Sequence, residues 1–419
     1  MTIDIRARIT FDSKQPLADT KAGRAASFFI QKPSNPTVNP EILTNSAKAQ
    51  EAAGYDSSLI WNFAASPDVW SVAAWALSAT SSLRIVAAHR PGVQAPTVAA
   101  RTLATLDRLS GGRQEVHIIQ GRTDADIARD GDFLDHDSRY RRSTEYLDII
   151  RREWAAFDPF DYDGEFYTVR NAQSGVHPVA QPGPRIHAAG NSEAGLDFVS
   201  QNADVWAIGG LGLDDVTAQI ERGRTAAATH GRTLGYWFGG FNVILADSDE
   251  EAWAFTRDIA GHVITFLNKE EQSIADWEQR LGGSVQTGTG ATDIQASAFD
   301  LDQDEQFRPE GPLYTRFSAL TGHGPSLVGT PDSVASYLAD YYRAGVEVIT
   351  LGGIPELFGD DGTELLDVHQ KQLRKELIAA LRTQAGRIDR ERITATGDSQ
   401  QSPSHLDHSQ DPRERGTVA

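Results

Sequence analysis

The sequence predicts an α/β fold, a TIM (β/α)8 barrel with insertions after strand 1 and strand 7. Short β-rich runs alternate with longer helical patterns, and each of eight strand candidates is followed by a helix or by a loop and a helix. This alternation implies a parallel sheet. Eight units within residues 1–385 fit a barrel better than an open doubly wound sheet. The Rossmann-like alternative lacks a G-x-G-x-x-G after its first strand.

The eight expected strands are short runs bounded by polar or glycine-containing segments. In chain order they are residues 7–11, 57–61, 83–88, 114–119, 184–189, 204–210, 237–245 and 346–353. The expected helices are residues 39–55, 68–80, 90–113, 137–157, 193–202, 213–231, 250–268, 330–345 and 364–383.

Helix boundaries follow from spacing and from end signals. In the segment 90–113, Leu103 and Leu106 belong to an apolar set at helical spacing, Pro96 suits a first turn, and Gly111 suits a stop. Ser192 is a natural N-cap for the helix that begins at Glu193. The same reasoning predicts a long helix after the acidic loop that ends near Asp137.

Two insertions interrupt the pattern, and a polar segment follows it. Residues 12–38 lengthen the connection after the first strand, and residues 246–325 separate the seventh strand from the eighth. Long loops at the C-terminal side of a barrel cover active sites, so the loose stretch 282–311 is expected to be a lid, with a plain surface excursion as the alternative. Residues 1–385 form the expected barrel domain. Residues 386–419 are polar and are expected to be a disordered tail.

Composition narrows the class of protein. The chain has 419 residues, 40% of them hydrophobic, and its formal net charge of −19 disfavours nucleic acid and anionic membranes as partners. We find no apolar run long enough to span a membrane and no secretory signal at the start. Cysteine is absent, which excludes disulfides and fits a cytoplasmic protein.

Candidate site residues are sought where strands end, because active sites of barrels lie at that face. These ends provide Asn62, His89, Gln120 and the turn Gly190-Asn191-Ser192. A glycine, a serine hydroxyl and a helix N-terminus form a seat for phosphate, although Ser192 fits a plain helix cap equally well. Tyr140 lies where the loop after the fourth strand enters a helix. Its neighbours Arg139, Arg141 and Arg142 are expected to form a solvated face.

Familiar catalytic motifs are missing from the sequence. There is no H-E-x-x-H, no convincing metal-ligand spacing, no G-x-S-x-G and no phosphate-binding P-loop. A barrel without a nucleophile, a metal or an acid pair suggests that the chemistry belongs to a bound cofactor.

Several segments together resemble the bacterial luciferase-like flavin monooxygenases, and most of all the branch of reduced-FMN-dependent alkanesulfonate monooxygenases. The resemblance covers most of residues 40–355 except the lid. It is carried by "RPGVQAPTVAARTLATLDRLSGGR" (90–113), "EVHIIQG" (115–121), "GDFLDHDSRYRRSTEYLDIIRREW" (131–154), "GNSEAG", "ADVWAIGG", "FNVILADSDEEAW" (241–253) and "GTPDSVASYLADYYRAGVEVITL" (329–351).

The resemblance implies a barrel that binds reduced FMN, supplied by a separate NAD(P)H:FMN reductase, and uses O2 as a co-substrate. It places the phosphate at Gly190, Asn191 and Ser192, with Tyr140 nearby. Asn62, His117 and Gln120 would face the flavin. Barrels of this family commonly form homodimers or homotetramers.

The chain departs from the sulfonate branch at positions where that branch binds its substrate. An arginine and a histidine on the seventh strand are matched by Gly240 and Asn242, and a tyrosine after the eighth strand is matched by Ile354. The lid arginine has no secure match, although Arg308 and Arg316 are near. Losing a bidentate donor favours a less charged substrate, such as a sulfone or an amide-like N-heterocycle, over a sulfonate.

These observations lead to a two-component FMN-dependent monooxygenase of a small organosulfur or related compound. We expect catalytic roles for Asn242, His89 and Arg316. Arg308, Ile354 and Trp206 are expected to contact the substrate or belong to the lid. An F420-dependent oxidoreductase on the same barrel and a flavin-binding protein without catalysis are the alternatives.

Overall fold

Eight parallel strands close into a barrel in the computed structural model, which describes residues 3–12, 15–30, 38–121, 123–209, 212–269, 297–321, 324–352 and 367–398. The barrel strands are β1 (Asp4–Arg8), β2 (Ser57–Ile60), β3 (Arg84–His89), β4 (Gln114–Ile118), β7 (Ile186–Ala189), β8 (Val205–Ile208), β9 (Gly235–Leu245) and β12 (Val348–Gly352). Each pairs with the next in that order, and β12 closes the barrel on β1. This confirms the predicted TIM fold.

The first strand begins earlier than predicted. It spans Asp4–Arg8 rather than residues 7–11, because Ile5 and Ala7 face the outer core while Arg6 lies inside the barrel among charged partners. A strand with charges on its inner face does not show the continuous apolar run expected of a parallel barrel.

Helices surround the barrel, and most were predicted to within a few residues. They are α2 (Pro40–Ala53), α3 (Val69–Ala79), α4 (Pro96–Ser110), α6 (His136–Ala155), α7 (Glu193–Asn202), α8 (Leu213–Thr229), α13 (Pro331–Ala344) and α14 (Val368–Asp398), with short turns α5 (Asp124–Ile127) and η1 (Ala128–Asp130) before α6. Ser192 and Thr330 accept N-cap hydrogen bonds, as their side chains predict.

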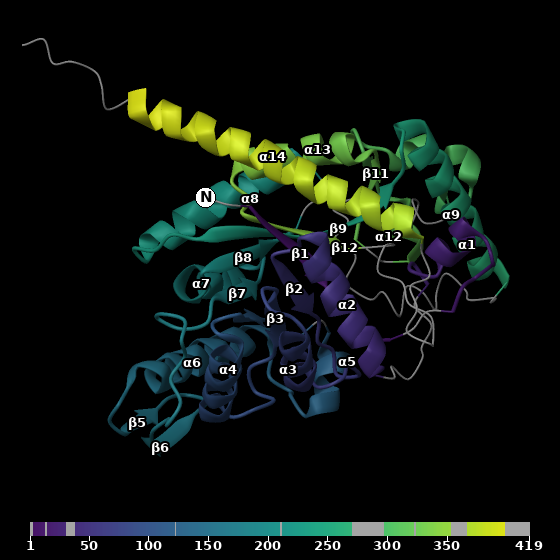
Figure 1. Ribbon diagram of the computed structural model, residues 1–419. Coiled ribbons are helices and arrows are strands. Elements are labelled where there is room, and N and C mark those ends of the chain that lie inside the picture. The colour runs from purple at the N-terminus through teal and green to yellow at the C-terminus, as the bar shows by residue number, and fades with distance from the viewer. Residues whose placement is uncertain are drawn as a thin grey trace, which may run out of the picture.

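The C-terminal helix corrects the predicted tail. Helix α14 runs to Asp398 alongside α13 and α2 (Figure 1), so residues 386–398 are helical rather than disordered. The reason is that Ile388 is buried and the Tyr342 hydroxyl donates to Asp389 at 2.8 Å. The rest of the expected tail, 399–419, lies outside the described residues.

The two predicted insertions pack together. Helix α1 (Lys21–Ala26) follows β1 and packs on α9 (Asp249–Lys269), which follows β9. With η2 (Leu301–Gln303), η3 (Glu305–Phe307), β10 (Leu313–Tyr314) and α12 (Arg316–Thr321), they share a second hydrophobic cluster in which Phe29 stacks on Phe317 at 3.8 Å. We call this unit the insertion module. Of the expected lid 282–311, residues 282–296 lie outside the described part.

Four short strands were not predicted. Strand β11 (Ser326–Gly329) runs parallel to the C-terminal half of β9, and β10 pairs antiparallel with β11, which fastens the insertion module to the barrel. Strands β5 (Phe160–Asp163) and β6 (Thr168–Ala172) form a separate antiparallel hairpin. All are five residues or fewer, so their sequence pattern is weak.

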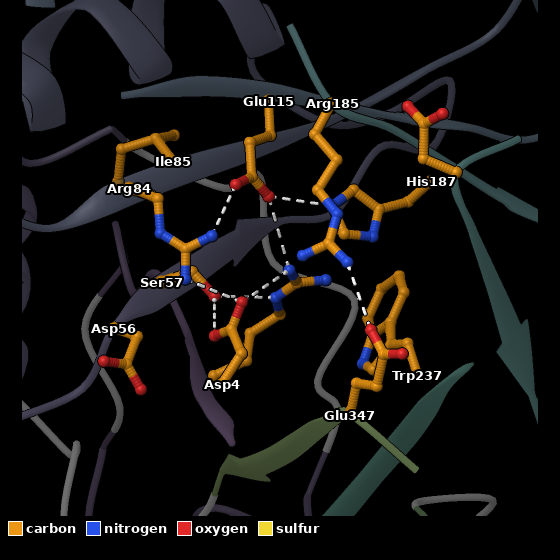
Figure 2. A network of polar contacts seen from close by, with 12 residues as sticks. Asp4, Asp56, Ser57, Arg84, Ile85, Glu115, Arg185, His187, Trp237 and Glu347 are labelled. Atoms are coloured by element: carbon orange, nitrogen blue, oxygen red, sulfur yellow. Dashed lines mark hydrogen bonds and ion pairs between the residues drawn. The ribbon is translucent and has the colours of Figure 1, made fainter. Parts of the chain in front are cut away.

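The barrel interior holds a network of charged side chains (Figure 2). Glu115 accepts from Arg84 at 2.6 Å and from His187 at 2.7 Å, and its carboxylate is 3.5 Å from Arg6. Arg6 is fully buried and lies over the Trp237 ring at 4.5 Å. Burial alone would raise the pKa of Glu115, but the hydrogen bond from His187 and the two guanidiniums hold it well below its usual range. The carboxylate is therefore ionised. The network lies near the N-terminal ends of the barrel strands, where β1, β3 and β4 begin.

Candidate functional site at the mouth of the barrel

The turn between β7 and α7 forms one side of the mouth, which is the face where the barrel strands end. Ser192 accepts from Gly195 N at 3.1 Å, and the Tyr140 side chain of α6 lies beside the Ser192 side chain. A Cβ on Gly190 would lie 2.7 Å from Gly195 Cα and 2.8 Å from the Tyr140 hydroxyl. Only glycine fits this approach. The turn exposes Ser192 and Asn191 at the start of a helix, where backbone N–H groups favour an anion.

Two further side chains hold this turn in place. Trp206 of β8 donates through its indole Nε1 to Gly190 O at 3.2 Å. Arg222 of α8 donates to Asn191 O at 3.2 Å and brings a positive charge to the turn. Arg222 could not be predicted from the sequence, because it is one of several charged residues on an exposed helix face. The turn is thus fixed from both neighbouring elements.

Gln120 lies between this turn and the barrel interior. Its Oε1 accepts from Ser143 of α6 at 2.9 Å, and Ser143 is one helical turn from Tyr140. Its Nε2 is buried and has no partner within the described part of the chain. A buried amide donor costs free energy unless something satisfies it, so this atom favours a ligand that carries an acceptor.

His117 points into the barrel from β4, above the charged network. Its ring meets the Trp237 ring edge-on at 4.8 Å, and its Nδ1 is buried without a partner among the described residues. Burial, together with the nearby charges of His187 and Arg6, lowers the pKa of His117 to about 3. The imidazole is neutral at physiological pH, so it offers one donor and one acceptor at the mouth.

Asn62 follows β2 and donates to Ala88 O of β3 at 3.1 Å, which leaves its carbonyl oxygen directed away from the strand ladder. Asn62, His117, Gln120 and Tyr140 therefore lie on β2, β4 and α6, on one side of the mouth next to the Ser192 turn. Hydrogen-bonding side chains that lie next to an anion-binding turn can together bind a flat heterocycle that carries a phosphate.

The structure corrects the expected position of His89. Its Nε2 is 2.7 Å from the Tyr146 hydroxyl of α6, and its ring packs on Trp70 of α3 at 5.0 Å. His89 therefore faces the helices outside the barrel rather than the mouth. Burial, with the charge of Arg90, lowers its pKa to about 3.

Trp206 is corrected in the same way. It is fully buried on the outside of the barrel, where a Cβ on Gly223 of α8 would lie 2.8 Å from its ring. It supports the Ser192 turn through its hydrogen bond to Gly190 O, and its ring packs against Gly223 of α8.

The two arginines expected in the lid are built into the insertion module. Arg316 is fully buried, donates to Ala298 O at 2.6 Å and lies over the Phe307 ring at 4.4 Å. Arg316 and Arg308 both pair with Asp304, and Arg308 also covers the Trp253 ring at 4.0 Å. Both guanidiniums are thus held by Asp304 and by aromatic rings inside this unit. Their positions correct the catalytic role expected for Arg316 and the substrate role expected for Arg308.

Asn242 lies where β9 meets the insertion module. It is fully buried, and its Nδ2 donates to Gly324 O at 2.9 Å. Its Oδ1 has no partner within the described ranges, so a role at the site stays a prediction. Ile354 lies outside the described residues.

The expected basic face on α6 is largely buried. Arg142 pairs with Asp132 at 2.5 Å and Arg139 with Asp124 at 3.0 Å, and both are less than 10% exposed. Arg141 alone is exposed, where it pairs with Glu165. These pairs fix the loop before α6 and so orient Tyr140.

Two further features of the described residues concern membranes and metals. No helix among them is long and apolar enough to cross a membrane. No group of three His, Asp or Glu side chains in the same ranges could hold a metal ion.

Comparisons with known proteins agree with the fold. Residues 21–347 match the family described as luciferase-like monooxygenase. Riboflavin lyase, solved with modified FMN and riboflavin, superposes with a TM-score of 0.65 at 17% identity, covering 91% of this chain and 92% of that one. EDTA monooxygenase from Chelativorans sp. BNC1 gives 0.64 at 16% identity, covering 91% and 94%. The F420-dependent tetrahydromethanopterin reductase from Methanopyrus kandleri gives 0.58 at 14% identity, covering 90% and 97%. At these identities the structures show a shared fold.

Proposed function

The chain belongs to the luciferase-like monooxygenase family, and from that premise we propose that it is a two-component monooxygenase that uses reduced FMN and O2. The proposed substrate is a small organosulfur compound, a sulfonate or a sulfone, or a related N-heterocycle. Reduced FMN would be supplied by a separate NAD(P)H:FMN reductase.

One observation carries the proposal. The buried Nε2 of Gln120 and Nδ1 of His117 have no partners within the described residues. Gln120 accepts from Ser143 on the same helix as Tyr140, and His117 lies on β4 opposite His187 of β7, the strand that leads into the Ser192 turn. A flavin has polar edges on a flat ring and a phosphate at the end of a short chain, which matches this arrangement. The residues present therefore fit the cofactor.

Each residue has a distinct task in this proposal. Ser192, Tyr140 and the α7 N-terminus bind the phosphate, and Arg222 adds charge compensation. Gln120, His117 and Asn62 orient the ring by hydrogen bonds to its edge. The reduced flavin, when bound, supplies the electrons that activate dioxygen. Because the His117 imidazole is neutral, it places no additional charge beside the flavin ring.

An anaerobic titration with reduced FMN and, separately, reduced F420 tests the choice of cofactor. We expect saturable binding of reduced FMN with micromolar or tighter affinity and much weaker binding of F420. The presence of an F420-dependent enzyme among the structural neighbours is the reason to include the second ligand. Tight binding of F420 alone would replace the proposal with a hydride-transfer enzyme.

Oxygen consumption then separates an enzyme from a flavin-binding protein without catalysis. With FMN, NADH and a reductase present, the proposal requires additional oxygen uptake or substrate loss when a substrate from the proposed classes is added. FMN binding without such turnover across sulfonates, sulfones and N-heterocycles would leave the non-catalytic alternative.

A further inference from the structure

We propose that Trp61 and Phe63, which follow β2, form a stacking surface for the substrate, and that the substrate carries an aromatic or heteroaromatic ring. These two residues are called the aromatic pair below. The inference rests on the proposed function and specifies its substrate class.

The aromatic pair stands where the inner face of β2 reaches the mouth. Ser57 of β2 lies inside the barrel, where its hydroxyl accepts from Arg6 at 2.9 Å. Leu59 packs on the inner cluster that contains Trp237. Side chains alternate along a strand, so Trp61 follows Ser57 and Leu59 on the same side, one step beyond the strand end.

Three aromatic rings follow one another at this edge of the mouth. The Trp61 ring is centred 4.9 Å from the Phe11 ring and 5.4 Å from the Phe63 ring, at interplanar angles of 38° and 44°. Phe11 is 1% exposed, Trp61 is partly buried and Phe63 is 37% exposed, so the row of rings runs from the core to the surface. A further ring can extend this row in the tilted or offset geometries that aromatic side chains prefer.

The turn after Trp61 holds the pair in place. Phe63 N donates to Ser66 Oγ at 2.8 Å, and Ser66 N donates to Phe63 O at 2.9 Å. Ala64 N donates to the Asp126 carboxylate at 3.3 Å, which ties the turn to α5 in the loop after β4. Because this backbone is already ordered, a ligand that stacks on the pair has less conformational entropy to pay on binding.

Neighbouring loops continue an apolar surface on the same face of the barrel. Val93, in the loop after β3, is 44% exposed, and Phe133, in the loop before α6, is 82% exposed. Asp126 connects these loops, because it accepts from Ala64 N and lies 3.8 Å from Arg90. Their charges are thus paired with each other while apolar side chains face outward. Exposed apolar surface of this kind marks a binding site, and here it favours the flat face of a ring.

The aromatic pair also lies beside the proposed cofactor site. Asn62, which is proposed to face the flavin, stands between its two members, and its Nδ2 is fixed on Ala88 O at 3.1 Å. The Ser192 turn is separated from β2 by β3 and β4 in the barrel order. A ring held by the pair would therefore lie next to the flavin edge without competing for the phosphate site.

Binding of two matched probes, methyl phenyl sulfone and cyclohexyl methyl sulfone, tests the proposal by calorimetry, with and without FMN. Wild-type protein should bind the phenyl compound at least about threefold more tightly, as expected for one added aromatic contact. Trp61→Leu should abolish this preference, Trp61→Phe should keep part of it, and both should retain the wild-type affinity for reduced FMN. Phe157→Leu is the matched control, since Phe157 is 77% exposed beyond the C-terminal end of α6, at the opposite end of the barrel, and it should behave as wild type.

The outcomes separate this inference from the proposed function. Equal binding of the two sulfones by wild-type protein, no binding of either, or a full preference in Trp61→Leu overturns the role of the aromatic pair. A loss of FMN affinity in Trp61→Leu with an unchanged preference overturns it too, because Trp61 would then serve the cofactor. Failure of wild-type protein to bind FMN contradicts the proposed function alone, since the preference for the phenyl compound is also measured without FMN.

Discussion

At the scale of single residues, two side chains at the mouth of the barrel each have a buried polar atom without a partner within the described residues. Gln120 uses its oxygen on Ser143 and leaves its amide nitrogen buried, and His117 does the same with one ring nitrogen. Unpartnered buried atoms also occur elsewhere in the described residues. Asp107 Oδ2 accepts from the backbone N–H groups of residues 179 and 180, while Asp107 Oδ1 has no partner there. Such unsatisfied atoms are costly in a ligand-free protein and useful in a liganded one.

The first prediction concerns the Ser192 turn, the proposed binding site for the phosphate. Ser192→Ala and Tyr140→Phe should each weaken reduced-FMN binding by about 1 kcal/mol, or about fivefold, because each removes one hydrogen bond. Thr330→Ala is the control, since Thr330 caps α13 as Ser192 caps α7 but lies away from the turn. Anaerobic titration measures the dissociation constant of reduced FMN for each of the three variants. Unchanged affinity in both test variants would refute the assignment of the phosphate to this turn.

The buried histidines give a prediction on pH. Burial lowers the pKa of His187 to about 4 and those of His89 and His117 to about 3, against about 6.5 in an unfolded chain. As the pH falls from about 6.5 toward 4, the unfolded chain takes up protons that the folded protein does not. Stability should therefore decrease by up to about 1.4 kcal/mol per pH unit for each histidine.

Urea unfolding at pH 7.5 and pH 5 measures this effect. The midpoint should be lower at pH 5, and His187→Gln should reduce the difference because one such proton is removed. A variant with the same pH dependence as wild type would show that His187 is protonated within the fold.

Residue-scale predictions from sequence succeeded where the local pattern decides the structure. Ser192 follows a strand and precedes an apolar helix, so its N-cap position could be read directly. The environment of Arg316 could not, because it depends on how the irregular segment before it, which holds Asp304 and Phe307, packs against α12. His89 ends a strand, but the sequence does not say on which side of the barrel its ring lies.

At the scale of elements, the insertion module depends on one carboxylate. Asp304 accepts from the Tyr314 hydroxyl at 2.8 Å and pairs with Arg308 and Arg316. Arg316→Ala should destabilise the protein by about 3 kcal/mol, because it leaves buried Asp304 less compensated. Arg343→Ala removes an exposed i,i+3 pair and should cost less than about 0.5 kcal/mol.

Chemical unfolding and limited proteolysis of the insertion module measure the difference. Equal stability of the two variants would contradict a structural role for Arg316. Lost turnover in a fully stable Arg316→Ala protein would restore the catalytic role that its burial argues against.

The C-terminal helix provides a matched pair of isoleucines. Ile388 is 2% exposed and Ile393 is 70% exposed, and both lie in α14. Ile388→Ala should lower the free energy of unfolding by about 2–4 kcal/mol, whereas Ile393→Ala should change it by less than about 0.5 kcal/mol. Similar values for both would show that residues 386–398 do not pack as described. The end of α14 could not be predicted from the sequence pattern, because polar residues surround the isolated Ile388.

At the scale of the whole molecule, the eight-fold alternation was predictable because each strand and helix carries its own signal. The contacts that join these elements were less predictable, since β11 pairs with β9 residues 84 positions earlier and α1 packs on α9, which lies more than 200 positions later in the chain. The closed barrel brings the proposed flavin residues, which come from β2, β4, α6 and the β7–α7 turn, to one side of the mouth. The ionised network around Glu115 and Arg6 lies inside the same barrel.

A crystal structure of the chain with FMN tests the central claim most directly. The account predicts the phosphate within hydrogen-bonding distance of Ser192 and Tyr140, with the ring edge on Gln120 Nε2 and His117. FMN bound away from the β7–α7 turn, or a mouth that stays empty at saturating FMN, would contradict it.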